Sequence, residues 1–316
     1  MPTVAEVAPL LRAEVAKAVA GQDAVVESCM VALLANGHVL LEGVPGVAKT
    51  LLVRSLAAAL ALDYTRIQFT PDLMPSDVLG TRVYNPRTLD FELRTGPVFT
   101  SILLADEINR TPPKTQSALL EAMEERRVTL DGEPHVLPSP FVVFATQNPL
   151  DFEGTYPLPE AQQDRFLLKV LVEYPQLTEE REVLRRHHEG FRPQALEAAG
   201  VKPVVSAGDL DALRAEVAGQ TVDAPVVDYI LAVVRATRDV DELRAGASPR
   251  AGIALLNGAK ALAALRGRPF VIPDDVKELA APALRHRVIL RPEAEVEGLT
   301  TDAVLKEIVD RVPVPR

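Results

Sequence analysis

Short runs of consecutive apolar residues recur along the first half of the chain and predict buried strands. These runs cover residues 38–43, 64–69, 101–107, 141–149 and 166–175. Between them, apolar residues spaced three and four positions apart predict helices at residues 4–18, 22–35, 49–62 and 112–125. Because strands alternate with helices and are almost continuously apolar, the pattern predicts an α/β fold whose parallel sheet is covered on both faces.

The pattern changes after about residue 175. Helical spacing then continues without a convincing strand, in segments 178–190, 208–217, 223–239, 248–266, 273–284 and 300–312. We therefore place a domain boundary at YPQLTEE, with an α/β domain at residues 1–175 and a smaller all-helical domain at residues 176–316. Within the first domain, the Asp131-Gly132 pair in RVTLDGEPHVL predicts a hairpin at about residues 127–137.

Composition and charge narrow the possible functions. The chain of 316 residues is 47% apolar and 25% charged, which is ordinary for a globular protein. A formal net charge of −10 argues against a general nucleic-acid binder, since phosphate contacts require a basic face. The single cysteine, Cys29, excludes an internal disulfide and is expected to be buried and inert. No apolar stretch is long enough to span a membrane and no signal peptide is recognised, so we expect a cytoplasmic location.

The stretch GVPGVAKT, residues 43–50, follows a predicted strand and opens a predicted helix. It resembles the phosphate-loop pattern G-x-x-x-x-G-K-[ST], except that Ala48 stands at the second glycine. In such a loop, backbone N–H groups face phosphates, Lys49 reaches the β and γ oxygens, and Thr50 ligates Mg²⁺. We expect a positive φ at Gly46 and an ordinary dihedral at Ala48. An ordinary strand–turn–helix junction is the competing interpretation.

Two acids end another predicted strand, in ILLADEINR at residues 102–110. At the carboxyl end of a parallel strand, Asp106 can hold Mg²⁺ and its water, and Glu107 can orient and deprotonate an attacking water. Asn148, at the end of FVVFATQNP, could bind that water or the γ-phosphate, although an Asn before Pro149 equally suits a turn. Acids at a strand end can also simply face solvent.

Basic side chains complete the set of candidates. Arg165 in QQDRFLL and Arg250 in ASPRAG could supply positive charge to a γ-phosphate, although surface charge is the usual role of an arginine. His187 and His188 do not form a convincing metal site, because adjacent helical residues face different directions and no further ligand pattern surrounds them.

Together these residues resemble the AAA+ ATPases, and within them the MoxR family. The similarity rests on GVPGVAKT, on RIQFTPDLMPSDVLGTRVY, and on the long run from GPVFTSILLADEINRTPPKTQSALLEAMEERRVTLDG through ATQNPLDFEGTYPLPEAQQDRFLLKV. It covers nearly the whole chain, including a C-terminal lid with an SPRA segment. MoxR-like phosphate loops commonly carry alanine before the lysine, so Ala48 fits this family.

The resemblance implies a role for each candidate. Lys49 and Thr50 match Walker A, Asp106 and Glu107 match Walker B, and Asn148 matches sensor 1. Arg165 matches the arginine finger that acts on a neighbouring subunit's ATP, with Arg110 as a second candidate. Arg250 matches sensor 2, which would reach the nucleotide of its own subunit. The expected nucleotide-binding residues are Gly21, Gln22, Gly43, Val44, Pro45, Gly46, Val47, Ala48, Lys49, Thr50, Leu51 and Asp106.

The resemblance also implies a biological role. Residues 80–94 match a helix-2 insertion, which with the predicted hairpin lines the pore or substrate face of a hexamer. The family implies ATP and Mg²⁺ as cofactors, a hexameric ring, and chaperone-like remodelling or maturation of client protein complexes. It also implies von Willebrand factor A domain partners and, in some cases, metal insertion.

Three other functions stay open from the sequence. One is the ATPase subunit of a metal-chelatase-like complex. A second is a nucleotide-dependent scaffold without hydrolysis, against which Lys49, Asp106, Glu107 and Arg165 count. A third is a DNA-translocating motor, against which the acidic balance counts.

Overall fold

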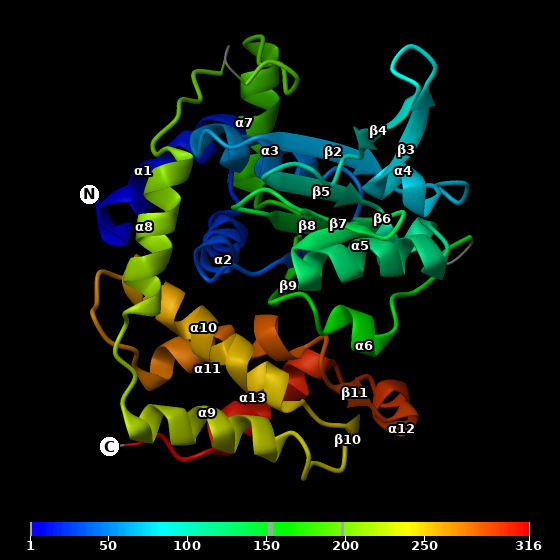
Figure 1. The fold of residues 1–316 in the computed structure, drawn as a ribbon. Helices are drawn as coiled ribbons and strands as arrows, with labels where there is room; N and C mark the ends of the chain where they lie inside the picture. The colour runs from blue at the N-terminus through cyan, green and yellow to red at the C-terminus, as the bar shows by residue number, and fades with distance from the viewer. Residues whose placement is uncertain (1, 151–153, 197–198, 316) are drawn as a thin grey trace.

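A five-stranded parallel sheet forms the centre of the first half of the chain (Figure 1). The computed structural model describes residues 2–150, 154–196 and 199–315. The strand order is β2-β5-β8-β1-β9, and every neighbouring pair is parallel, as the apolar runs predict. The strands are β1 Val39–Glu42, β2 Tyr64–Gln68, β5 Ile102–Asp106, β8 Val142–Gln147 and β9 Leu168–Leu171.

The two faces of the sheet pack into separate apolar clusters. On one face, alternate strand residues such as Leu41, Leu104 and Phe144 pack with three helices: α1 Val4–Ala18, α2 Asp23–Leu34 and α3 Lys49–Ala59. On the other face, the intervening residues such as Leu40 and Leu103 pack against α5 Pro113–Glu125 and α4 Pro75–Leu79. This alternation explains why the strands are nearly continuously apolar, since both sides of each strand are buried.

Two hairpins extend from the sheet domain. The predicted hairpin forms between β6 Arg127–Leu130 and β7 Glu133–Val136, and Asp131 and Gly132 at its turn both have positive φ. Residues matched to an insertion form a second hairpin, β3 Gly80–Asn85 and β4 Asp90–Thr95, which projects from the body of the molecule (Figure 1). Two short helical segments, η1 Ile108–Arg110 and α6 Glu160–Gln163, join the strands elsewhere.

The second half of the chain is mostly helical, as predicted. Its helices are α7 Leu177–His188, α8 Ala207–Ala218, α9 Ala224–Ala236, α10 Pro249–Leu265, α11 Pro273–Leu284, α12 Pro292–Val296 and α13 Thr301–Arg311. The expectation of an all-helical domain was wrong in one detail, because β10 Leu243–Ala245 and β11 Ile289–Leu290 form an antiparallel pair. Strands this short carry too few residues to show alternation, which is why the pattern missed them and the single-turn helix α12.

The two halves share apolar contacts. One continuous cluster of buried side chains includes residues of α1 and α2 together with residues of α8 and α10. Cys29 is fully buried in this cluster, and burial raises the pKa of its thiol to about 12, so it is the inert thiol expected. A domain boundary near residue 175 stays a prediction, since this core crosses it.

Candidate functional site

The loop after β1 contains two glycines with different structural causes. At Gly43, a Cβ atom would lie 2.4 Å from the backbone oxygen of Val172, so only glycine fits beside the end of β9. Gly46 has φ +90°, which confirms the expected positive dihedral, and the space around its Cα is open. The loop therefore leaves the sheet at one fixed point and turns toward solvent at another.

Ala48 does not have the ordinary dihedral that we expected. It is the N-terminal capping residue of α3 with φ 62° and ψ 22°, in the left-handed region. An L-residue with a Cβ atom costs about 1–2 kcal/mol there, whereas glycine does not. The backbone at the second glycine of the general phosphate-loop pattern is therefore left-handed. This chain has the same backbone conformation there, but with a strained alanine.

Lys49 and Thr50 begin α3 directly beneath this loop. The Lys49 ammonium donates to the backbone oxygens of Gly43 and, at 3.0 Å, of Val44. The Thr50 hydroxyl lies 3.5 Å from Asp106 Oδ2. The first turn of α3 therefore places an ammonium and a hydroxyl beside the carboxyl end of β5.

Asp106 ends β5 and is bonded from both neighbouring strands. Its Oδ1 accepts a hydrogen bond from the Thr146 hydroxyl of β8 at 2.5 Å. Its Oδ2 accepts from Arg66 of β2, at 2.9 Å from Nε and 2.7 Å from Nη2. Because β5 lies between β2 and β8, the strand order itself brings these partners to the carboxylate.

Glu107 follows with a left-handed backbone, φ 57°. Its N–H donates to the Thr146 hydroxyl at 2.8 Å. Its carboxylate Oε2 accepts from Gln68 Nε2 at 2.7 Å and lies 3.1 Å from Arg110 Nε.

Sequence reasoning missed Arg66, Gln68 and Thr146. The polar residues that flank Ile67 in YTRIQF could have indicated the first two, since they precede the end of a neighbouring strand.

A cleft of about 1000 Å³ opens between the loop at residues 43–50 (below, the phosphate-like loop, because it resembles a phosphate-binding loop), these strand ends and α7. Most of the predicted nucleotide-binding and catalytic residues line it: Gln22, Pro45, Gly46, Val47, Ala48, Lys49, Thr50, Leu51, Asp106, Glu107 and Asn148. Gly21, Gly43 and Val44 are not among the lining residues. The Asn148 side chain also accepts a hydrogen bond from the Leu150 N–H at 3.1 Å, so it both faces the cleft and holds a turn.

The wall opposite the loop is largely apolar and was not predicted. It includes Val19, Tyr174, Val183, Leu184 and Phe191, which come from the end of α1, from α7 and from the segments beside it. Gln22 joins the two sides, because its Nε2 donates to the Glu173 carbonyl at 2.9 Å. His187 also lines the cleft. Among the described residues, no group of histidine, cysteine and acidic side chains is arranged to hold a metal.

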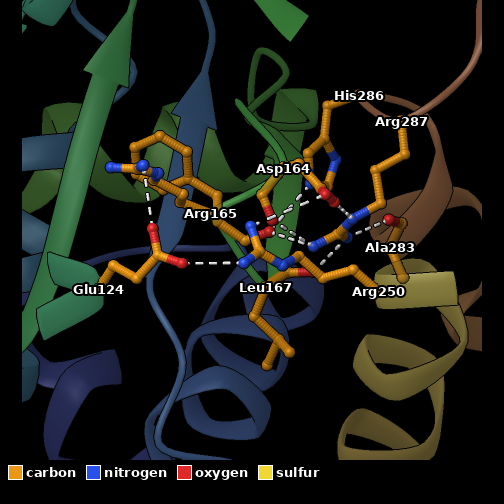
Figure 2. A network of polar contacts seen from close by, with 9 residues as sticks. Glu124, Asp164, Arg165, Leu167, Arg250, Ala283, His286 and Arg287 are labelled. Atoms are coloured by element: carbon orange, nitrogen blue, oxygen red, sulfur yellow. Dashed lines mark hydrogen bonds and ion pairs between the residues drawn. The ribbon is translucent and has the colours of Figure 1, made fainter. Parts of the chain in front are cut away.

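The two predicted arginines lie elsewhere (Figure 2). Arg165 Nη2 is 2.9 Å from one oxygen of Glu124, and Arg250 Nη2 is 2.8 Å from the other. They line a second cavity of about 250 Å³ together with residues that immediately precede β1 and β9. This cavity is therefore at the amino edge of the sheet, whereas the large cleft is at the carboxyl edge.

Arg250 consequently does not reach the cleft of its own chain, contrary to the expectation from the resemblance. The physical reason is the position of α10, which packs against α2 and α1 and not over the phosphate-like loop. Figure 1 shows α7 high in the view and α10 in the lower half of the molecule, below α2. Arg165 and Arg250 instead form one basic cluster with a shared carboxylate.

Comparison with known proteins gives this architecture a family. Residues 38–168 match the model of the ATPase family associated with various cellular activities, and residues 235–308 match the AAA lid domain. The chaperone MoxR1 of Mycobacterium tuberculosis is 46% identical over 323 residues, covering 99% of this chain and 84% of that protein. This chain belongs to the MoxR family of AAA+ ATPases.

Two further relatives agree with this assignment. The protein MoxR of Methylorubrum extorquens is 32% identical over 96% of this chain and 93% of its own length. The crystal structure of a Cytophaga hutchinsonii protein assigned as an ATPase is 42% identical, with a TM-score of 0.88 over 98% of each chain.

We use "lid" below for residues 235–308 of this MoxR-family chain. Among its described residues, no helix is both long and apolar enough to cross a membrane.

Proposed function

We propose that this MoxR-family protein binds ATP and Mg²⁺ in the large cleft and hydrolyses the ATP. The observation that carries the proposal is the convergence of Lys49, Thr50, Asp106, Glu107 and Asn148 on that one cleft. Lys49 and the backbone N–H groups at the start of α3 would bind the phosphates. The apolar wall near Tyr174 and Leu184 would pack against the base, with Gln22 beside it.

The donor atoms suit magnesium. The Thr50 hydroxyl and the Asp106 carboxylate are hard oxygen donors that lie 3.5 Å apart, and Mg²⁺ prefers oxygen ligands. When bound, Mg²⁺ would neutralise charge on the phosphates. Asp106 is kept in place by the Thr146 hydroxyl, and Thr146 also holds the backbone of Glu107. One threonine therefore fixes the metal-binding carboxylate and the proposed base relative to each other.

Glu107 is the proposed base. A carboxylate next to a phosphate site can accept a proton from an attacking water. In this structure the Glu107 carboxylate is bonded to Gln68 and paired with Arg110. Activation of water would require Glu107 to exchange one of these partners for the water, and Asn148 is available in the same cleft to bind it.

The position of the two arginines supports a proposal that several copies assemble. Arg165 and Arg250 are at the amino edge of the sheet, so the ATP that they contact would be bound by a neighbouring copy whose cleft faces this edge. We propose a ring, hexameric by family resemblance, in which both arginines act on the neighbour. AAA+ proteins are usually oligomeric, which supports this arrangement.

Hydrolysis would drive chaperone-like remodelling or maturation of client protein complexes. The name of the relative MoxR1 supports a chaperone role. The β3–β4 hairpin exposes apolar side chains, including Val83, Leu89 and Phe91, that a client protein could contact. A von Willebrand factor A domain partner, metal insertion and a cytoplasmic location remain part of this proposal on the resemblance alone.

The substitution Glu107→Gln tests the hydrolytic site. We expect Mg²⁺–ATP affinity within about threefold of the wild type and turnover lower by about 10²-fold or more, because the loss removes a general base. The matched control is Glu121→Gln, at an exposed position of α5, which should leave turnover unchanged. Undiminished turnover in Glu107→Gln would remove Glu107 as base. A wild-type protein that binds ATP without turnover would be a non-hydrolysing scaffold.

A further inference from the structure

Residues 164–167, here called the finger segment, contain Arg165 and connect α6 to β9. Side chains of the lid form hydrogen bonds with the backbone of this segment. Arg287 donates from Nη2 to the carbonyl oxygens of Asp164 at 3.0 Å and Phe166 at 2.7 Å. From Nη1 it donates to the carbonyl oxygen of Leu167 at 3.0 Å. The neighbouring His286 Nε2 bonds the same Phe166 oxygen at 3.0 Å. Figure 2 shows Arg287 and His286 beside this segment, with the dashed contacts of Arg287 gathered near Asp164.

The backbone of the finger segment depends on these lid side chains. The N–H groups of the segment form hydrogen bonds with other backbone groups, since Phe166 donates to the Gln163 carbonyl and Leu167 to the His38 carbonyl. Its carbonyl groups lie where α6 has ended, so helix bonds cannot use them. Arg287 supplies the missing donors, and its side chain is only 3% exposed. Water therefore has little access to replace the guanidinium.

Charge also joins the lid to the finger segment. Arg287 Nε donates to Asp164 Oδ1 at 2.6 Å, while Asp164 Oδ2 lies 4.0 Å from Arg250 Nη1 of α10. The side chain next to Arg165 is thus paired with two lid arginines. A guanidinium can make these several bonds at once because its five donors lie in one rigid plane, which an ammonium cannot reproduce.

We propose that Arg287 is a positioning residue for Arg165, so that the orientation of the lid sets where this arginine points. A lid that shifts relative to the sheet would move the carbonyl groups of residues 164, 166 and 167, and Arg165 lies among them. The inference rests on the proposed function, in which Arg165 acts on ATP bound by a neighbouring copy. It adds that the lid of one subunit controls hydrolysis in the next.

Mixing of variants tests this role. Arg287→Lys keeps the charge and loses the planar donor set, so turnover should fall by about 10- to 100-fold, as for a catalytic group misplaced by about 1 Å. ATP affinity should stay within about threefold, since Arg287 is remote from the cleft. Mixed with Lys49→Ala, Arg287→Lys should regain turnover, because some interfaces then pair an intact loop with an intact finger. Mixed with Arg165→Ala, it should regain none.

The matched control is Arg268→Lys, also in the lid. Arg268 donates to the buried carboxylate of Asp275 at 2.9 Å and is not bonded to the finger segment. This variant should keep turnover within about threefold of the wild type, which separates loss of a buried lid ion pair from loss of finger position.

Two results would overturn the inference. The first is Arg287→Lys with wild-type turnover. The second is a loss of turnover that Lys49→Ala does not rescue, although it rescues Arg165→Ala in the same mixed rings; Arg287 would then be structural only. If Arg165→Ala itself is not rescued in demonstrably mixed rings, the proposed action on a neighbour fails, and the inference fails with it.

Discussion

Arg66 forms an ion pair with Asp106, the carboxylate that we expect to bind Mg²⁺. Its guanidinium lies 2.7 Å from Asp106 Oδ2, the same oxygen that faces the Thr50 hydroxyl. A second bond, from Nη2 to Gln68 Oε1 at 2.6 Å, connects Arg66 to the residue that holds Glu107. The side chain is 47% exposed, so solvent screens the ion pair and it can be exchanged. Arg66 would therefore compete with Mg²⁺ for Asp106 at the proposed metal site.

Replacing Arg66 should make Mg²⁺ binding easier. An ion pair at this exposure is worth up to about 1 kcal/mol, so Arg66→Ala should lower the Mg²⁺ concentration for half-maximal ATP binding by about two- to fivefold. A Mg²⁺ titration with a fluorescent ATP analogue measures this. Arg54→Ala is the control, because Arg54 lines the same cleft but bonds the carbonyls of Pro193 and Gln194. A higher Mg²⁺ requirement in Arg66→Ala would show that Arg66 assists binding.

Single residues also mark the limit of sequence reasoning. The types and spacing of Lys49, Asp106 and Asn148 predicted that they share a site, because parallel strands end at one edge. The left-handed dihedral of Ala48 was not predicted, since an alanine at a helix start usually has ordinary dihedrals, although the glycine that the general phosphate-loop pattern has at this position indicates a positive φ. Its strain appears only when the loop, fixed at Gly43 by the end of β9, must turn into α3.

At the scale of elements, His38 joins three parts of the sheet domain. It precedes β1 and is 4% exposed. Its Nδ1 accepts a hydrogen bond from the Val143 N–H of β8 at 3.0 Å, so the proton is on Nε2, which donates to the Met123 carbonyl of α5 at 3.2 Å. Burial, and then the charge of Arg126, lower the His38 pKa to about 3.

This pKa predicts acid sensitivity between pH 6.5 and pH 5. There the unfolded chain binds a proton at residue 38 and the folded chain does not, so the stability contributed by neutral His38 is lost as the pH falls. The loss amounts to about 2 kcal/mol at pH 5 relative to pH 7.5. Urea unfolding at both pH values should show it. His38→Gln, which cannot titrate, should show a smaller loss, and the exposed control His188→Gln should match the wild type. An equal loss in His38→Gln would assign the effect to other groups, such as buried His286, whose pKa burial also lowers.

Elements were predictable where many residues repeat one pattern. The five strands and the longer helices follow from runs and helical spacing of apolar residues. The β10–β11 pair was not predictable, because each strand is three residues or fewer and its partner lies beyond α10 and α11 in the sequence. The hairpin at residues 127–136 was predictable despite short strands, since Asp131-Gly132 specifies the turn directly.

At the scale of the molecule, the chain separates the parts that phosphoryl transfer needs. The phosphate-like loop and the acids are at the carboxyl edge of the sheet, and the Arg165–Arg250 cluster is at the amino edge. Sequence motifs identify each part but not the position of the lid, which is set by packing of α10 on α1 and α2. A local basic cluster also coexists with a net charge of −10, which the overall composition cannot show.

This separation predicts that activity depends on protein concentration. A single chain does not present Arg165 or Arg250 to its own cleft, and an arginine acting on the γ-phosphate is worth about 10³–10⁵ in rate. Turnover per chain should therefore fall at least about tenfold when the protein is diluted below its assembly concentration.

Light scattering in parallel should show ATP-promoted growth from the 34.2 kDa chain to a ring. Glu107→Gln should assemble with ATP and stay inactive, whereas Lys49→Ala on its own should not respond to ATP and should enter rings only together with copies that bind ATP. Constant turnover per chain from a species that remains a monomer at high protein and nucleotide concentration would contradict the ring, because the cleft would then be complete without a neighbour.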